Sequence, residues 1–288
     1  MLVERITSKQ NPLIKRFRRV RIGDEHHLVF IEGIRLIEDA LKAGVHFESV
    51  AYSLALESTE RGAQLQDDLL HVPCRGALVP QQILDSIADT ESPQGIVAIV
   101  SRPHYEIADV FDDEVPLLII ADELQDPGNI GNIIRTAEAA GASGLITLRH
   151  TVDPYNLKAL RASMGSAFRL PVATDIKRDE AIQSCKERGI KIVASRLPSK
   201  NRVVLEDAAI VAKESVYTEA DLTTPVAIVL GREASGVSED ISAAADMFVH
   251  IPMSEGIESL NVAAAATLLL YEAARQRNFQ FKKRLTQT

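Results

Sequence analysis

The second half of the chain alternates short hydrophobic runs with stretches of helical spacing, and this pattern constrains the fold more than any other feature. The runs that predict strands lie at residues 116–121, 144–148, 190–194, 226–230 and 247–251. The stretches that predict helices lie at residues 129–140, 156–163, 238–244 and 260–277. Strand–helix alternation is typical of a parallel sheet with helices on both faces.

Three segments rich in polar residues follow three of these predicted strands. They are residues 126–141 (DPGNIGNIIRTAEAAG), 231–238 (GREASGVS) and 251–261 (IPMSEGIESLN). Ligands of open α/β sheets bind at the carboxyl ends of the strands. The segments therefore predict one ligand site at the end of the sheet.

The first segment reads as a turn followed by an amphipathic helix, with Asn129 expected at the N-cap. Arg135 lies off the apolar stripe. Its side chain, which leans toward the helix N-terminus, could reach a phosphate bound there. The alternative is a helical ion pair between Arg135 and Glu138.

The second and third segments place a carboxylate and two small polar side chains at the same edge. Glu233 lies in a turn between two glycines, where it could accept a hydrogen bond from a ligand or orient an arginine. Its alternative role is a capping acid for the following helix. Ser259 and Asn261 flank the start of an almost wholly apolar helix, and the alternative for Ser259 is a simple N-cap.

Together and in this order, the three segments resemble the motifs of the SpoU/TrmH family of RNA 2′-O-ribose methyltransferases, within the SPOUT superfamily. The resemblance implies an α/β parallel-sheet SPOUT domain with a deep trefoil knot, S-adenosylmethionine as cofactor and a homodimer. The catalytic residues that it implies are Arg135, Asn129, Glu233, Ser259 and Asn261. The cofactor-binding residues that it implies are Leu230, Gly231, Ile251, Met253, Ser259 and Leu260.

Two departures from the family pattern fall in these segments. Arg232 stands where relatives often have Asn, and Glu255 stands where they commonly have Gly. For Arg135 the family mechanism implies the role of base for the ribose hydroxyl. A guanidinium is effectively always protonated, so a phosphate clamp that orients the hydroxyl is the other interpretation.

The first half predicts a small α/β domain, and it too resembles the family. The segments SKQNPLIK, FIEGIRLIEDAL and TESPQGIVAIV are similar to the substrate-binding domain of the ribosomal-RNA branch. We therefore expect an RNA substrate-binding domain at 1–102, a linker at 103–114 and the methyltransferase domain at 115–288. The expected substrate is 23S ribosomal RNA, and the alternatives are a transfer RNA methyltransferase or an RNA-binding module without turnover.

Charge is distributed in a way that suits an RNA partner although the net charge is −8. Residues 1–22 hold seven basic residues and one acid, and residues 275–288 hold five basic residues and no acid. Clustered cations release condensed counterions from a phosphate backbone; solvated basic ends are the alternative. The residues expected to bind RNA are Lys9, Asn11, Lys15, Arg16, Arg18 and Arg19. Residues 23–27 (GDEHH) depart from relatives, which often carry basic residues there.

Other site classes lack a sequence signal. No Cys/His cluster has zinc-ligand spacing, so no metal is indicated. No G-x-G-x-x-G segment predicts a standard dinucleotide loop. Two distant cysteines, no apolar signal segment and no run long enough to span a bilayer lead us to expect a cytoplasmic protein without a membrane partner.

Overall fold

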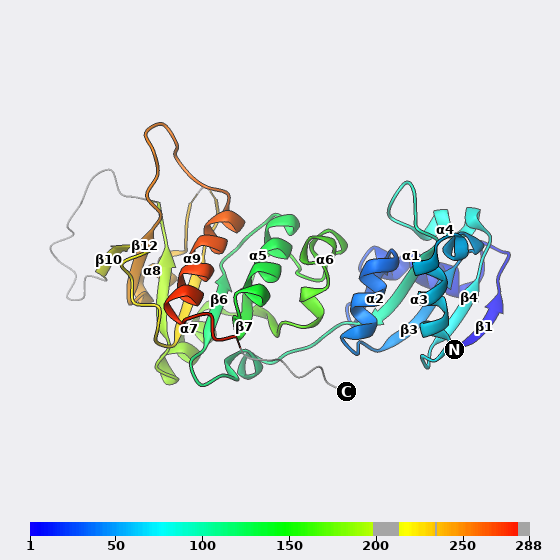
Figure 1. Cartoon of the computed structure of the whole chain (residues 1–288), viewed down its shortest axis with the longest axis horizontal. Coiled ribbons are helices and arrows are strands. Elements are labelled where there is room, and N and C mark those ends of the chain that lie inside the picture. Colours follow the sequence, from blue (N-terminus) through cyan, green and yellow to red (C-terminus); the bar gives the residue numbers. More distant parts are fainter. Residues whose placement is uncertain (198–212, 234, 282–288) are drawn as a thin grey trace. The chain divides into compact units, whose positions relative to one another are not determined.

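The computed structural model describes residues 1–197, 213–233 and 235–281 (Figure 1). They form two compact units. The first is Met1–Pro103 with Tyr155–Phe168, and the second is His104–Pro154 with the described residues from Arg169 onward. No helix in the described ranges has both the length and the apolar character needed to cross a membrane.

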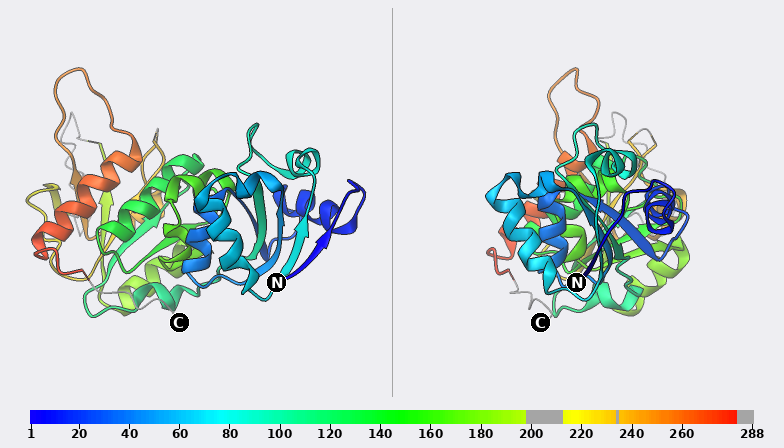
Figure 2. Two further views of the ribbon diagram at one scale, coloured as in Figure 1. Left: turned by 45° about the vertical axis from the view of Figure 1, so that its right-hand side comes forward. Right: turned by 90° about the vertical axis from the view of Figure 1, so that its right-hand side faces the viewer.

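The first unit is a five-stranded sheet between helices. Its strands are β1 (Leu2–Arg5), β2 (Leu28–Glu32), β3 (Phe47–Tyr52), β4 (Arg75–Leu78) and β5 (Ile96–Ser101), in the order β1-β4-β3-β5-β2. Its helices are α1 (Pro12–Arg21), α2 (Ile34–Lys42), α3 (Glu60–Leu70), α4 (Gln81–Ile87) and α6 (Leu157–Ser163). The 3₁₀ turns are Leu54–Ser58 and Ser166–Phe168. Helices α1 and α4 share one core with residues of four strands, and helices lie on both faces of the sheet (Figure 2).

The second unit is a seven-stranded sheet in which every pairing is parallel. Its strands are β6 (Leu117–Ala121), β7 (Gly144–Leu148), β8 (Val172–Ile176), β9 (Lys191–Ser195), β10 (Lys213–Val216), β11 (Val226–Leu230) and β12 (Met247–His250). Its helices are α5 (Pro127–Ala139), α7 (Arg178–Glu187), α8 (Glu239–Ala244) and α9 (Val262–Gln276). Helices α5 and α9 pack together on one face, and α7 and α8 contribute to the core on the other (Figure 1). The structure confirms the predicted α/β class with a parallel sheet.

The order of this sheet brings the polar segments together. The strands run β10-β12-β9-β11-β6-β7-β8, so β12, β9, β11 and β6 are consecutive neighbours. In a parallel sheet their carboxyl ends meet at one edge. Each of the three polar segments starts at that edge.

Two parts of the predicted organisation differ in the structure. The predicted linker 103–114 holds a 3₁₀ turn, Ile107–Phe111, whose Val110 and Phe111 are buried in the core of the second unit. The segment Tyr155–Phe168, which the sequence placed in the methyltransferase domain, clusters with the first unit.

Candidate active site

Three side chains, one from each polar segment, form a continuous chain of hydrogen bonds. Asn261 Nδ2 donates to Asn129 Oδ1 at 2.9 Å, and Asn129 Nδ2 donates to Glu233 Oε1 at 2.8 Å. Asn129 therefore connects residues that lie 104 and 132 positions away in the sequence. We call Asn261, Asn129 and Glu233 the relay. The predicted convergence of the three segments is present in the structure.

Helix starts hold the two asparagines in place. Asp126 is the N-cap of α5, its carboxylate accepts from the Asn129 backbone N–H at 2.8 Å, and Pro127 occupies the first turn. Asn261 is the N-cap of α9, and its Oδ1 accepts from the backbone N–H of Ala263 and Ala264. The orphan amide donors of a helix N-terminus thus orient the Asn261 side chain.

These caps correct two sequence interpretations. Asn129 was expected at the N-cap of its helix, but the helix begins two residues earlier, at Pro127, because Asp126 supplies the cap. The suggestion that Ser259 caps the apolar helix is also wrong, since Asn261 does so and Ser259 lies two residues before it.

Arg135 is exposed on α5 and lies outside the relay. It makes no hydrogen bond or ion pair with any residue that the structure describes. The alternative pairing with Glu138 is not formed, because both Glu138 carboxylate oxygens accept from Arg169, at 2.7 and 2.9 Å. Arg135 is thus free to meet a partner from outside this chain.

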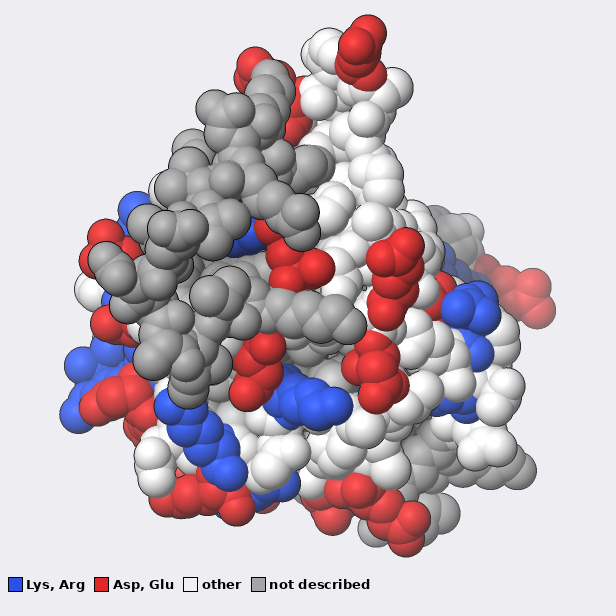
Figure 3. Space-filling view, turned by 90° about the vertical axis from the view of Figure 1, so that its left-hand side faces the viewer, with Lys and Arg blue, Asp and Glu red and all other residues white. Residues whose placement is uncertain are grey.

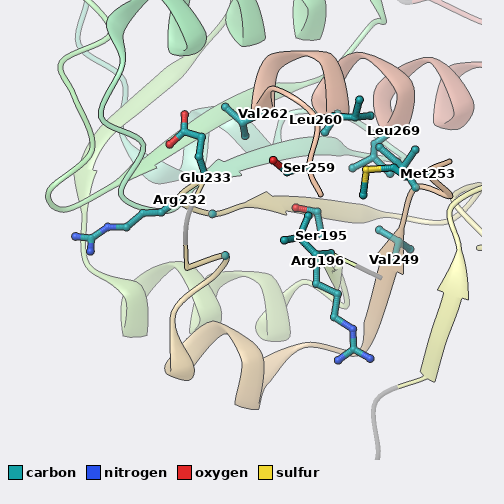
Figure 4. Close-up of a pocket in the computed structure, with 15 residues that line it drawn as sticks. Ser195, Arg196, Arg232, Glu233, Val249, Met253, Ser259, Leu260, Val262 and Leu269 are labelled. Atoms are coloured by element: carbon teal, nitrogen blue, oxygen red, sulfur yellow. The ribbon is translucent and has the colours of Figure 1, made fainter. Parts of the chain in front are cut away.

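An open cavity lies beside the relay (Figure 4). It is lined by the ends of β9, β11 and β12 and by the first turns of α9. Apolar side chains form much of its wall: Val249, Ile251, Met253, Leu260, Val262 and Leu269. Glu233 of the relay lines it as well. Clefts with a mainly apolar lining and a few polar groups at the edge hold small-molecule ligands.

Most of the residues predicted to bind the cofactor line this cavity. Gly231, Ile251, Met253, Ser259 and Leu260 do so. Leu230 is fully buried in β11 and is not part of the lining. Gly231 admits no side chain, because a Cβ there would stand 2.2 Å from the Gly236 backbone.

Sequence reasoning missed the contribution of β9. Ser195, Arg196 and Leu197 line the cavity, and Ser195 Oγ donates to the Val229 carbonyl at 3.0 Å. The Arg196 guanidinium stacks on Phe248, 4.5 Å from the ring centroid, and pairs with Glu214. The polar pair that follows the predicted strand 190–194 is the signal that could have revealed this wall.

The predicted RNA-binding residues lie in or just before α1, in the first unit, and several are already paired. Arg16 contacts Glu25 at 3.3 Å and Glu48 at 3.5 Å. Arg19 contacts Glu25 at 3.5 Å and Asp24 at 3.9 Å. The acids of the GDEHH segment therefore partly neutralise this helix.

The other predicted RNA contacts divide into two groups. Lys9 and Lys15 are exposed. Arg18 donates to Ser86 Oγ at 2.9 Å, and Asn11 is the N-cap of α1. Among the coloured residues of the face in Figure 3, acidic and basic side chains are intermixed.

The basic residues predicted at the C-terminal end already have partners where the structure describes them. Arg275 is held by Glu272 at 2.7 Å, and Arg277 turns inward to donate to four backbone carbonyls. Burial lowers the pKa of the Arg277 guanidinium. Lys282, Lys283 and Arg284 lie outside the described residues.

The chemistry of the site follows from these contacts. An apolar cavity suits an aromatic base and a thioether-like chain, and the relay places a carboxylate at its edge. Within the described residues, no group of three or more His, Cys, Asp or Glu side chains could hold a metal ion. The arrangement is suited to align two organic reactants.

Comparisons with known proteins agree with this geometry. The sequence model of the SpoU rRNA Methylase family matches residues 116–271, and that of the MRM3-like substrate binding domain matches residues 11–98. The chain is 31% identical over 280 residues to a 23S rRNA (uridine(2479)-2′-O)-methyltransferase of Streptomyces viridochromogenes, covering 95% of this chain and 92% of that one. It is 27% identical over 274 residues to the 23S rRNA (guanosine(2553)-2′-O)-methyltransferase RlmP of Bacillus subtilis, covering 93% and 98%.

A solved structure is similar over nearly the whole length. It is the AdoMet-bound rRNA methyltransferase from Sinorhizobium meliloti, with a TM-score of 0.80 and 29% identity, covering 95% of this chain and 98% of that one. The family model spans more than half of the chain, and it contains every residue of the relay. On these grounds the chain belongs to the SpoU rRNA Methylase family.

Proposed function

We propose that this protein is an S-adenosylmethionine-dependent methyltransferase that acts on a ribose 2′-hydroxyl of 23S ribosomal RNA. The observation that carries the proposal is the relay, which joins the three polar segments at the edge of an apolar cavity. Two relatives are named as 23S rRNA 2′-O-methyltransferases, and the similar solved structure is that of an AdoMet-bound rRNA methyltransferase.

The lining of the cavity fits the proposed cofactor in its chemistry. The wall from β12 and α9 offers Met253, Val262 and Leu269 to an adenine ring, and Gly231 leaves backbone groups accessible. We assign cofactor contacts to Gly231, Ile251, Met253, Ser259 and Leu260. S-adenosylmethionine supplies an electrophilic methyl group when it is bound there.

The chain's own residues would align the ribose and handle its proton. In-line transfer requires the 2′-hydroxyl to be held at a fixed distance and angle. We assign this positioning to Asn129, Glu233, Ser259 and Asn261. Arg135 is then the base, assisted by the substrate phosphate, or the clamp that holds that phosphate and orients the hydroxyl.

The two units would divide the work. We propose that residues 1–102 bind the RNA substrate through Lys9, Asn11, Lys15, Arg16, Arg18 and Arg19. The second unit, His104–Pro154 with the described residues from Arg169 onward, would carry the methyl transfer. The match of residues 11–98 to a substrate-binding family supports this division.

Two further properties are proposed on the family resemblance with structural support. A trefoil knot is consistent with α9, which follows β12 but packs on α5, the helix that follows β6. A homodimer is supported by exposed apolar side chains of α9, namely Leu268 and Tyr271. A cytoplasmic location stays a prediction.

The test is methyl transfer from labelled S-adenosylmethionine to 23S rRNA taken from cells that lack this protein. We expect label in the rRNA and one new ribose methylation when the sites are mapped. Label in transfer RNA alone would favour the transfer RNA alternative. RNA binding without label in either substrate would favour a module without turnover.

A further inference from the structure

Two reciprocal backbone hydrogen bonds close the turn that presents Glu233. Arg232 N–H donates to the Gly236 carbonyl at 3.0 Å, and Gly236 N–H donates back to the Arg232 carbonyl at 2.9 Å. Glu233 itself is exposed. The two backbone bonds do not fix the direction of the Glu233 side chain, so contacts from outside the turn must do so.

The dipeptide that follows β6, Asp122-Glu123, contacts the turn at both ends. Asp122 N–H donates to the Leu230 carbonyl at 2.8 Å, where the chain enters the turn. Asp122 Oδ2 accepts from Ser238 N–H at 2.7 Å, where the chain leaves it. Glu123 forms an ion pair with Arg232, the residue next to Glu233.

Charge balance explains why the Arg232 guanidinium pairs with the Glu123 carboxylate. The Asp122 side chain is 1% exposed and that of Glu123 is 17% exposed. Arg178 contacts both carboxylates, at 3.1 Å from Asp122, but it supplies only one positive charge to two negative ones. A buried charge without a partner is costly, and the Arg232 guanidinium compensates the second carboxylate.

Arg232 and Glu233 leave the turn in different directions (Figure 4). The Arg232 guanidinium is directed away from the cavity toward Glu123, while the Glu233 carboxylate accepts from Asn129. Holding one side chain therefore sets the direction of its neighbour.

We propose that Arg232 and Glu123 are positioning residues that fix the Glu233 carboxylate in the relay, an inference that rests on the proposed function. Arg232 contacts neither cofactor nor reacting atoms in this role and acts through Glu233. In this role Arg232 supports the turn through Glu123 and makes no phosphate contact.

The first test compares Arg232→Ala with Arg232→Lys in single-turnover methylation at saturating RNA and S-adenosylmethionine. We expect a roughly tenfold slower rate for Arg232→Ala, because small displacements of aligned groups cost about this much or more. Arg232→Lys should recover part of the rate, since an ammonium still pairs with Glu123. Cofactor affinity should change little. Arg61→Ala is the matched control, because it removes another half-exposed arginine paired with a glutamate.

The second test is a double-mutant cycle with Glu233→Gln. If Arg232 acts through Glu233, adding Arg232→Ala to Glu233→Gln should slow the reaction no further. A full additional tenfold loss would overturn the proposal. So would a wild-type rate for Arg232→Ala at saturating RNA together with weaker RNA binding and a flatter salt dependence, since that pattern marks a phosphate contact.

Arg232→Asn provides a second variant of the same position if Arg232→Ala does not fold. It should also be slower than the wild type, with unchanged cofactor affinity. A wild-type protein that transfers no methyl group to any RNA would instead contradict the proposed function, whatever the variants do.

Discussion

At the scale of single residues, Asn129 is the centre of the site because it is the only member of the relay bonded to both others. Asn129→Ala should slow methyl transfer by roughly a hundredfold, the scale of lost alignment. Asn129→Asp should be slower still, since it sets a carboxylate against Glu233. Single-turnover assays at saturating RNA would measure both.

The matched control for Asn129 lies on the same helix. Asn132→Ala removes the same amide from an exposed position of α5 and should keep the rate within a few-fold of the wild type. Equal losses for Asn129→Ala and Asn132→Ala would show that the relay has no special role.

Arg135 gives a separate prediction because it is exposed and has no partner among the described residues. Arg135→Ala should lower methyl transfer by roughly a hundredfold or more, as expected for a lost proton-transfer group. Its melting temperature should stay near that of the wild type, since no described contact is removed. Arg135→Lys should not restore the rate, because a point charge does not replace the planar fork. Wild-type turnover by Arg135→Ala would leave Arg135 as a surface residue only.

The sequence could predict which residues belong to the site where a motif identifies them. It could not predict the contacts that depend on tertiary structure. The meeting of Asn129, Glu233 and Asn261 followed from three segments at strand ends. Their hydrogen-bond order did not, because it depends on which residue caps each helix. The choice of Asp126 over Asn129 as the cap is set by the position of Pro127, which suits the first helical turn.

At the scale of elements, removing an acid that pairs with the arginines of α1 should raise the affinity of the protein for RNA. Glu25 contacts both Arg16 and Arg19, and its side chain is 13% exposed. Glu25→Gln should remove one of the two acids paired with each guanidinium group. The variant should therefore bind RNA more tightly, with a steeper dependence on salt concentration. Filter binding at several KCl concentrations would measure this.

Glu38 supplies the control for Glu25. Its side chain is 15% exposed and pairs with Arg61, and Glu38→Gln makes the same chemical change outside α1. Equal effects of the two variants would argue against α1 as the RNA surface.

In the opposite direction, Lys9→Glu with Lys15→Glu should weaken RNA binding and leave cofactor affinity intact.

The strands that sequence reasoning missed share a physical cause. Strands β1, β8 and β10 lie at sheet edges, where one side lacks a partner strand and a continuous hydrophobic run is not required. Helix α7 buries only Ala181 and Cys185, so its apolar periodicity is weak. Helix α3 was also not predicted, although Thr59, its N-cap, is a helix-start signal in the sequence. Central strands such as β6 and β11, buried along their whole length, were predicted within one residue.

At the scale of the whole molecule, Arg277 ties the end of the last described helix to the starts of two central strands. Its guanidinium donates to the carbonyls of Leu222, Val115, Pro116 and Thr224, at distances from 2.6 to 3.3 Å. Arg277→Ala should lower the free energy of unfolding by about 2–4 kcal/mol, because several buried carbonyls lose their donor. Urea denaturation would measure the loss. Arg275→Ala, which removes a more exposed neighbour, should cost much less.

The proposed homodimer is a second prediction at this scale. Leu268 and Tyr271 are 38% and 43% exposed on α9, one turn apart. Leu268→Glu with Tyr271→Glu should shift sedimentation from twice the chain mass to the 31.5 kDa of one chain. A wild-type protein that sediments as an active monomer at micromolar concentration would contradict the dimer.

The order of the relay along the chain has a consequence for synthesis. Asn129 leaves the ribosome first, Glu233 follows about a hundred residues later, and Asn261 comes with the helix that it caps. A nascent chain that still lacks α9 has no donor for Asn129 Oδ1, so its site is chemically incomplete even if the sheet has begun to form. Activity therefore reports that translation has passed residue 261, and a product truncated before that point should bind RNA through its first unit without methylating it.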